Sequence, residues 1–271
     1  MNQDVWVSRH PYLQPVADLH TQVTAACADG PRVFATIPNW DDYDHDYHRS
    51  VPLLASSCAG VELQPAEEIL VSLLAKLGSL CLPQRLAAES RELDDQLHSE
   101  VAAPQRALGW LLGTENFAPA HPGLLRYLGW TALARYLHPI VDGFSKWRDE
   151  ELWLRPYCPT CGSAPSMSQL VEIDSARRRL LSCGCCGTRW QYRRMSCPFC
   201  ETTDTHRLSV LAIEGEGDLR IEYCESCRAY LKTYIGAGSE TVFLADWTSF
   251  HLDIIALDRG LKRLAGSLYE L

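Results

Sequence analysis

This sequence has no long hydrophobic segment and no leader of the usual kind. None of its apolar runs approaches the roughly 20 residues that a membrane-spanning helix needs. The stretch from Met1 to His20 lacks the basic start and apolar run of a secretory signal. We therefore expect a soluble, cytoplasmic protein without membrane insertion. A glycine-rich phosphate loop and a nucleophile elbow are also missing, so no local motif predicts an enzyme.

Positive charge is scarce as well. The chain carries 25 Lys and Arg against 34 Asp and Glu, for a net charge of −9. Residues 151–235 are nearly balanced, with 11 basic and 10 acidic side chains. Nucleic-acid-binding domains usually present a basic face, so this balance disfavours a zinc ribbon that binds nucleic acid. A local cluster of arginines either forms a contact patch or offsets the charge of a metal–thiolate centre: Arg177, Arg178, Arg179, Arg189, Arg193 and Arg194.

Cysteine, by contrast, is abundant, with 12 residues. Eight of them form four Cys-x-x-Cys pairs between residues 158 and 227. The first and third pairs are offset by 39 residues at both cysteines, and the second and fourth by 41. This register indicates a duplicated unit, and each copy has enough thiols for one tetrahedral four-sulfur site. The predicted ligands are Cys158, Cys161, Cys183 and Cys186 for site one, and Cys197, Cys200, Cys224 and Cys227 for site two.

These all-sulfur sets predict two bound metal ions, iron or zinc, because soft thiolates suit both and geometry does not choose between them. One interpretation is a structural staple, since small metal modules are often unfolded without their metal. The other is a one-electron iron centre or a metal-transfer site. A disulfide framework and a dithiol oxidoreductase are less favoured, because the sequence shows neither a signal peptide nor a βαβ context.

Each pair is expected to form a tight turn whose backbone N–H groups point at the thiolates. The residue after the second cysteine often has positive φ, which suits Gly162 and Gly187 in site one. Glu201 and Arg228 stand at this position in site two, so its turns are expected to be less regular. The remaining cysteines are interpreted as a spare thiol, Cys185, and as structural residues of the core, Cys27, Cys58 and Cys81.

The first 150 residues predict a helical domain from apolar residues at helical spacing. The predicted helices are 66–82, closed by Pro83, then 84–98, 101–112 and 123–143, the last kinked or ended by Pro139. Residues 39–50 are expected to form a loop, and its aspartates and histidines are interpreted as solvated rather than metal-bound. Near the end of the chain, residues 247–268 predict an amphipathic helix.

Short strands are expected inside each metal module, because β-branched and aromatic residues alternate there with turn residues. The predicted strands are 169–173, 179–182 and 189–194 in the first copy, and 208–214, 219–223 and 229–235 in the second. The arginines at 177–179 are expected around the turn between the two cysteine pairs of the first copy, outside the core. Trp190, four residues after Cys186, is expected to pack over site one.

Four segments, taken together, resemble the FdhE family of formate dehydrogenase accessory proteins. They are YCPTCGSAP at 157–165, LSCGCCGTRW at 181–190, CPFC at 197–200 and YCESCRAYLK at 223–232. The resemblance covers residues 155–255, including Ala245 and Asp246, and is only architectural over the helical half.

This resemblance implies an α+β protein with an α-helical N-terminal domain, two tandem rubredoxin-like (zinc-ribbon-like) four-cysteine metal modules and a C-terminal helix. The domains expected are 1–150, 151–194, 195–238 and 239–271. It also implies a non-enzymatic, cytoplasmic protein that binds metal, iron included, and contacts the catalytic subunit during maturation of formate dehydrogenase. The residues alone leave open a rubredoxin-like iron electron-transfer protein and, less favoured, a nucleic-acid-binding zinc ribbon. They do not indicate an oligomeric state.

Overall fold

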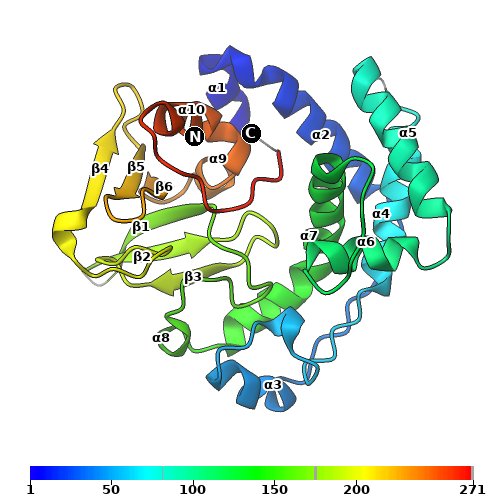
Figure 1. Ribbon diagram of the computed structural model, residues 1–271, viewed down its shortest axis with the longest axis horizontal. Helices are drawn as coiled ribbons and strands as arrows, with labels where there is room; N and C mark the ends of the chain where they lie inside the picture. Colours follow the sequence, from blue (N-terminus) through cyan, green and yellow to red (C-terminus); the bar gives the residue numbers. More distant parts are fainter. Residues whose placement is uncertain (81, 174–175, 270–271) are drawn as a thin grey trace. The chain divides into compact units, whose positions relative to one another are not determined.

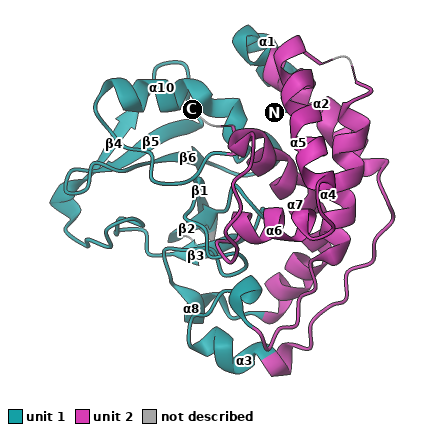
Figure 2. Cartoon of the chain, turned by 45° about the vertical axis from the view of Figure 1, so that its right-hand side comes forward, with its two compact units in different colours: residues 1–14, 43–56, 148–267 teal, residues 15–42, 57–147, 268–271 magenta. Residues whose placement is uncertain are grey.

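The computed structural model describes residues 1–80, 82–173 and 176–269 (Figure 1). The chain divides into two compact units (Figure 2). Unit 1 contains residues 1–14, 43–56 and 148–267, and unit 2 contains 15–42 and 57–147 with the segment from Leu268. Two N-terminal segments therefore belong with the cysteine-rich region, and the units do not follow chain order. The domain boundaries expected from the sequence stay a prediction.

Unit 2 is helical, as the apolar spacing predicts. Helix α4 packs against α7, and Leu70, Leu73, Leu128 and Leu133 are fully buried on these two helices. Such burial supplies most of the stability of an amphipathic helix in a protein. The helices are α2 (Gln14–Ala28), α4 (Gln64–Leu77), α5 (Gln84–His98), α6 (Ala103–Leu111) and α7 (Pro122–Trp147).

Helix α7 does not end at Pro139, which was one of the two expected outcomes, and a kink at this residue stays a prediction. Proline inside a helix removes one backbone hydrogen bond and costs about 3 kcal/mol. The apolar residues on either side, Leu137, Ile140 and Phe144, are all 0% exposed. Their burial offsets the cost of the proline, so the helix continues to Trp147.

Residues 39–50 also differ from the expectation, since they contain helix α3 (Trp40–His48) and not a loop. The local signals were present in the sequence. The Asn39 side chain accepts from the backbone N–H of Asp41, and acidic residues fill the first turn, where the helix dipole favours them. Tyr43 and Tyr47 are four residues apart and both buried. No side chain of this helix belongs to a group of possible metal ligands in the described part of the chain.

Unit 1 is built on one six-stranded sheet with the order β3-β2-β1-β6-β5-β4 (Figure 1). Each copy of the repeat supplies three antiparallel strands, and the copies join through parallel pairing of β1 with β6. The duplication thus produces a single continuous sheet. The strands are β1 (Met167–Ile173), β2 (Ala176–Ser182), β3 (Arg189–Tyr192), β4 (Leu208–Ala212), β5 (Leu219–Cys224) and β6 (Tyr230–Ile235).

Short helices complete unit 1: α1 (Gln3–Arg9), α8 (Glu150–Trp153), α9 (Glu240–Phe243) and α10 (Phe250–Asp258). The helix expected at 247–268 is therefore shorter than predicted. Gly260, at φ 68°, ends it with a Schellman motif: Leu261 N–H donates to Ala256 O and Gly260 N–H to Leu257 O. No helix within the described residues is both long and apolar enough to cross a bilayer.

Candidate metal centres

Site one brings together the four cysteines predicted for it. Two of them lie in the segment between α8 and β1, and two in the turn between β2 and β3. The Sγ atoms of Cys158 and Cys186 are 3.5 Å apart, and those of Cys161 and Cys183 are 3.4 Å apart. All four sulfurs lie within 4.8 Å of one another. The site is well covered, and Cys158 is 0% exposed.

Site two repeats this arrangement in the second copy. Its first pair follows β3, and its second lies in the turn between β5 and β6. The sulfur separations are 3.8 Å for Cys197 and Cys227 and 3.7 Å for Cys200 and Cys224. Cys200 is exposed and Cys227 half-buried, so this site is closer to solvent than site one.

The sulfur separations fit a metal ion. A tetrahedral ion about 2.3 Å from each sulfur places the sulfurs about 3.8 Å apart, whereas a disulfide needs about 2.05 Å. The observed range of 3.4–3.8 Å agrees with the first case and excludes the second for these pairs. Each group could hold one metal ion.

All four Cys-x-x-Cys turns have the same backbone geometry. The first cysteine's N–H donates to the carbonyl five residues on, and its carbonyl accepts from the N–H four residues on, at 2.8–3.2 Å. The residue after the second cysteine is left-handed in each turn: Gly162 (φ 77°), Gly187 (φ 76°), Glu201 (φ 56°) and Arg228 (φ 61°). The expectation of less regular turns in site two was wrong. A left-handed non-glycine residue persists where its surroundings determine the backbone, as this hydrogen-bonded turn does.

The thiols of each site shift one another's pKa values. Burial raises the pKa of Cys224, but backbone N–H groups of Cys227 and Ser226 and the neighbouring thiols lower it to about 7. In site one, the hydrogen bond with Cys158 contributes most to raising the pKa values of Cys161 and Cys183 well above their usual range. Four thiolates cannot coexist there without a metal ion to offset their charge.

The cysteines outside these two groups differ in how far they are buried. Cys185 is half-buried, and its N–H points at the Sγ of Cys183 at 3.4 Å, as expected inside such a turn. Cys27 is buried in α2, but Cys58 is exposed, so its interpretation as a core residue was wrong. Cys81 lies outside the described residues. Trp190 is 0% exposed and donates its Nε1–H to Arg155 O at 2.9 Å, while its packing over site one stays a prediction.

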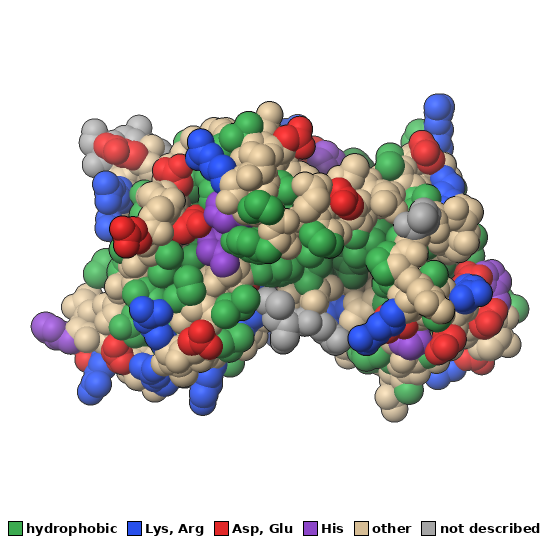
Figure 3. All heavy atoms as spheres, turned by 90° about the horizontal axis from the view of Figure 1, so that it is seen from above, with side chains coloured by type: hydrophobic (Ala, Val, Ile, Leu, Met, Phe, Trp, Pro, Cys, Tyr) green, Lys and Arg blue, Asp and Glu red, His purple; other side chains and the backbone are tan. Residues whose placement is uncertain are grey.

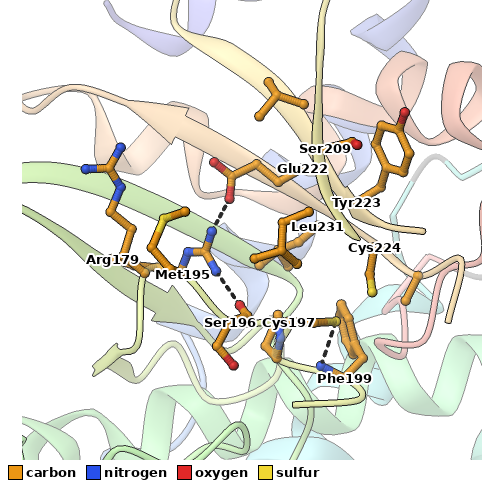
Figure 4. A pocket seen from close by; sticks show the side chains of 15 residues that line it. Arg179, Met195, Ser196, Cys197, Phe199, Ser209, Glu222, Tyr223, Cys224 and Leu231 are labelled. Atoms are coloured by element: carbon orange, nitrogen blue, oxygen red, sulfur yellow. Dashed lines mark hydrogen bonds and ion pairs between the residues drawn. The ribbon is translucent and has the colours of Figure 1, made fainter. Parts of the chain in front are cut away.

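One member of the arginine cluster is a buried link between the two copies. Arg179 on β2 forms an ion pair with Glu222 on β5 and donates to Ser196 O at 2.9 Å (Figure 4). Its side chain is 8% exposed, so it does not lie outside the core as the sequence suggested. Beside it is a hollow of about 170 Å³ whose lining includes Phe199, Leu231 and the site-two cysteines Cys197 and Cys224.

A buried charge network was not foreseen from the sequence. Lys232 is 1% exposed and lies 2.8 Å from Asp246 Oδ1 and 2.6 Å from Asp253 Oδ2. Arg263 closes the ring at 2.8 Å to each carboxylate, and Tyr230 donates its hydroxyl to Asp253 at 2.6 Å. Burial raises the pKa of Asp246, but Lys232 and Arg263 together hold it below the usual value. The YLK and AD segments of the family resemblance thus connect β6 to the C-terminal segment.

A third group of possible metal ligands contains no cysteine. His10, Glu216 and His251 offer ligand atoms within 4.8 Å of one another, all in unit 1. They are spread over more than 240 residues of chain, so no local pattern in the sequence could have found them.

We expect the purified chain to bind two equivalents of zinc plus iron at its four-sulfur sites. The measurement is elemental analysis of protein purified without oxygen, paired with thiol titration of the native chain. One equivalent, with all eight paired thiols reactive, would contradict the two ligand sets.

Comparison with known proteins finds relatives that match the first module and part of the chain around it. Residues 157–194 match the family model described as FdhE, central domain. A protein named FdhE homolog from Aquifex aeolicus is 33% identical over 137 residues, 49% of this chain and 48% of its own length. One from Pseudomonas aeruginosa is 30% identical over 171 residues, 60% of this chain and 54% of its own. The matched part thus spans about half the length of these relatives.

The fold is also similar to a solved structure. The crystal structure of the FdhE protein from Pseudomonas aeruginosa matches with a TM-score of 0.64 and 23% sequence identity. The match covers 96% of this chain and 89% of that chain. It confirms the expected fold class, with a helical N-terminal part followed by two four-cysteine clusters.

Proposed function

Because residues 157–194 match the FdhE central-domain model and about half the length of FdhE homologs matches this chain, we propose that it is a non-enzymatic accessory protein for the maturation of formate dehydrogenase. In this proposal it acts in the cytoplasm and contacts the catalytic subunit. The observation that carries it is the pair of four-sulfur groups in duplicated register within an FdhE-like fold. The identity of the client protein is inferred from the family resemblance of residues 155–255.

The eight paired cysteines are the proposed ligands of two iron or zinc ions. Each ion would hold two Cys-x-x-Cys turns beside the same sheet, so its first role is to keep the sheet and its loops together. A rigid metal-bound sheet can then present the side chains on its loops in a constant arrangement to a client. This role needs no catalytic residues.

A rubredoxin-like electron-transfer function is the second candidate, favoured by one observation. Site two has an exposed cysteine, Cys200, and iron near the surface exchanges electrons more readily than buried iron. Nucleic-acid binding receives no such support. On the face drawn in Figure 3, acidic and basic side chains are interspersed, with no continuous basic stripe on that face.

We expect affinity capture from native cytoplasm to retain the catalytic subunit of a formate dehydrogenase. Arg177 is exposed and Arg178 half-buried on β2, so we expect the Arg177→Ala/Arg178→Ala variant to capture less client, with capture falling as salt rises. Charge pairs at the rim of an interface respond in this way because salt screens them.

The matched control is Arg85→Ala/Arg91→Ala, which removes two arginines from α5 in unit 2 and should leave capture unchanged. Metal content is measured on all three proteins. Absence of the catalytic subunit from the native capture would reject the proposed function. Salt-insensitive capture by the β2 variant, equal to that of the native chain, would reject only the arginine contact.

A further inference from the structure

His10, Glu216 and His251 come from three separate segments of unit 1. His10 caps the C-terminal end of α1, Glu216 lies in the turn between β4 and β5, and His251 is the second residue of α10. The Nε2 atom of each histidine is 3.0 Å from the same oxygen, Glu216 Oε1. The two imidazole rings stack with their centroids 5.2 Å apart. One carboxylate oxygen therefore faces two ring nitrogens.

Hydrogen bonding leaves a lone pair on His10 facing this carboxylate. The Nδ1 atom of His10 lies 3.0 Å from Trp6 O, which can only accept, so Nδ1 carries the hydrogen. In a neutral ring the Nε2 atom then carries a lone pair. That lone pair points toward Glu216 Oε1, which is also electron-rich. A cation must lie between them, either a proton on His10 or a metal ion.

The remaining polar atoms of the cluster favour a metal ion. Glu216 Oε2 and His251 Nδ1 are buried without a hydrogen-bond partner among the described residues, while His251 Nε2 faces Glu216 Oε1 at 3.0 Å. The Glu216 side chain is only 9% exposed, so water does not readily satisfy it. One proton on His10, with a neutral His251 donating its Nε2–H to Glu216 Oε1, would still leave Glu216 Oε2 and His251 Nδ1 unpaired, and a second proton, on His251, would stack two imidazolium cations. A metal ion neutralises the carboxylate and is bound by the Nε2 lone pairs of both histidines together with Glu216.

The distances suit such an ion. Two ligands about 2.1 Å from a metal ion are about 3.4 Å apart in a tetrahedral site, and about 3.0 Å apart in an octahedral site, where they stand at right angles. Both nitrogen–oxygen separations have the second value. His10 has the arrangement typical of a metal-bound histidine, in which the second ring nitrogen donates to a backbone carbonyl and orients the ring.

We propose that His10, Glu216 and His251 form a third metal site, distinct in chemistry from the two four-sulfur sites. Two imidazoles and one carboxylate suit a divalent transition-metal ion, Zn²⁺ or Fe²⁺, with water at the remaining positions. The site ties α1 and α10 to the β4–β5 turn, so the ion stabilises the N-terminal segment against the second metal module. This inference does not depend on the proposed function.

The test is a zinc titration of the full chain after its four-sulfur sites have been filled. We expect one further equivalent, with a rise in melting temperature as it binds. Glu216→Gln keeps the shape of the side chain and removes its charge, and we expect it to abolish the third equivalent while keeping the first two. His251→Gln removes a ligand. It should therefore weaken binding of the third ion by more than the roughly 10- to 100-fold that is lost when a ligand loses its hydrogen-bonding partner.

The matched control is His206→Gln, which removes an exposed histidine from the second module and should leave three equivalents. Thermal unfolding in the presence of a chelator compares the stability of the native chain and the variants without metal. A native chain that binds no third ion would overturn the proposal. So would a third ion that Glu216→Gln retains, or a loss of stability in the variants that is the same with and without zinc, which identifies a hydrogen-bonded contact only.

Discussion

Replacing Cys158 by Ser is expected to remove one of the two ions bound at the four-sulfur sites and to lower the melting temperature by roughly 10 °C. Loss of a metal ligand is among the few changes that cost more than about 4 kcal/mol, and in a unit of this size each kcal/mol shifts melting by about 2–4 °C. Cys158 is fully buried, and hydroxyl oxygen is a poor substitute for thiolate at a soft ion. Metal content by elemental analysis and thermal unfolding together measure the effect.

The matched control is Cys185→Ser, within the same module and one residue from a predicted ligand. Cys185 lies outside the four-sulfur group, so the variant should keep both ions and melt close to the native chain. Cys197→Ser provides the parallel change in site two and should lose only that ion. Equal metal loss from Cys158→Ser and Cys185→Ser would mean that the ligand set of site one is misassigned.

Replacing Lys232 by Met is expected to destabilise unit 1 by about 3–5 kcal/mol, the usual cost of leaving a buried charge uncompensated. The variant leaves two buried carboxylates, Asp246 and Asp253, with Arg263 as the single remaining cation of the network. The buried charge network is attached to β6 and not to a cysteine turn. The ions of both four-sulfur sites should therefore stay bound. Chemical unfolding measures the free energy, and elemental analysis the metal.

The matched control is Lys262→Met, which makes the same substitution at an exposed side chain outside the buried network. It should change stability by less than about 0.5 kcal/mol. The double variant Lys232→Met/Asp253→Asn removes one charge of each sign. It should be more stable than the sum of the two single changes allows, because the sites share one network. Additive effects would show that the four charges do not act as a unit.

Local sequence patterns predicted the structure correctly where it depends on a few neighbouring residues. Each Cys-x-x-Cys turn closes through hydrogen bonds within six residues, so its existence follows from the sequence alone. The α5 helix was predicted at its observed bounds, 84–98. The segment at 39–50 was wrongly predicted as a loop because it is rich in charged residues. Asn39 and the Tyr43–Tyr47 spacing are nevertheless local signals of a helix.

Other local expectations failed because the contacts of the folded chain outweighed the conformational preference of a single residue. Pro139 alone disfavours a helix, but it is surrounded by fully buried apolar side chains whose positions only the folded unit provides. Glu201 and Arg228 disfavour a left-handed backbone, yet each adopts it inside a turn whose hydrogen bonds are the same as in the glycine-containing turns. In the first case the cost is offset by packing against the rest of the unit, and in the second by the hydrogen bonds of the turn itself.

The sequence by itself determined the duplication, the grouping of eight cysteines into two sets of four, the strands between them and the helical character of the first half. The tertiary structure decided that the two copies share one sheet through β1 and β6, and that Arg179 is a buried link between them. It also decided that Lys232 meets two carboxylates and that His10 and His251 meet Glu216. The physical reason is range: turns and periodic faces are set by neighbours in the chain, whereas ion pairs and the histidine cluster join residues that only folding brings within 3 Å.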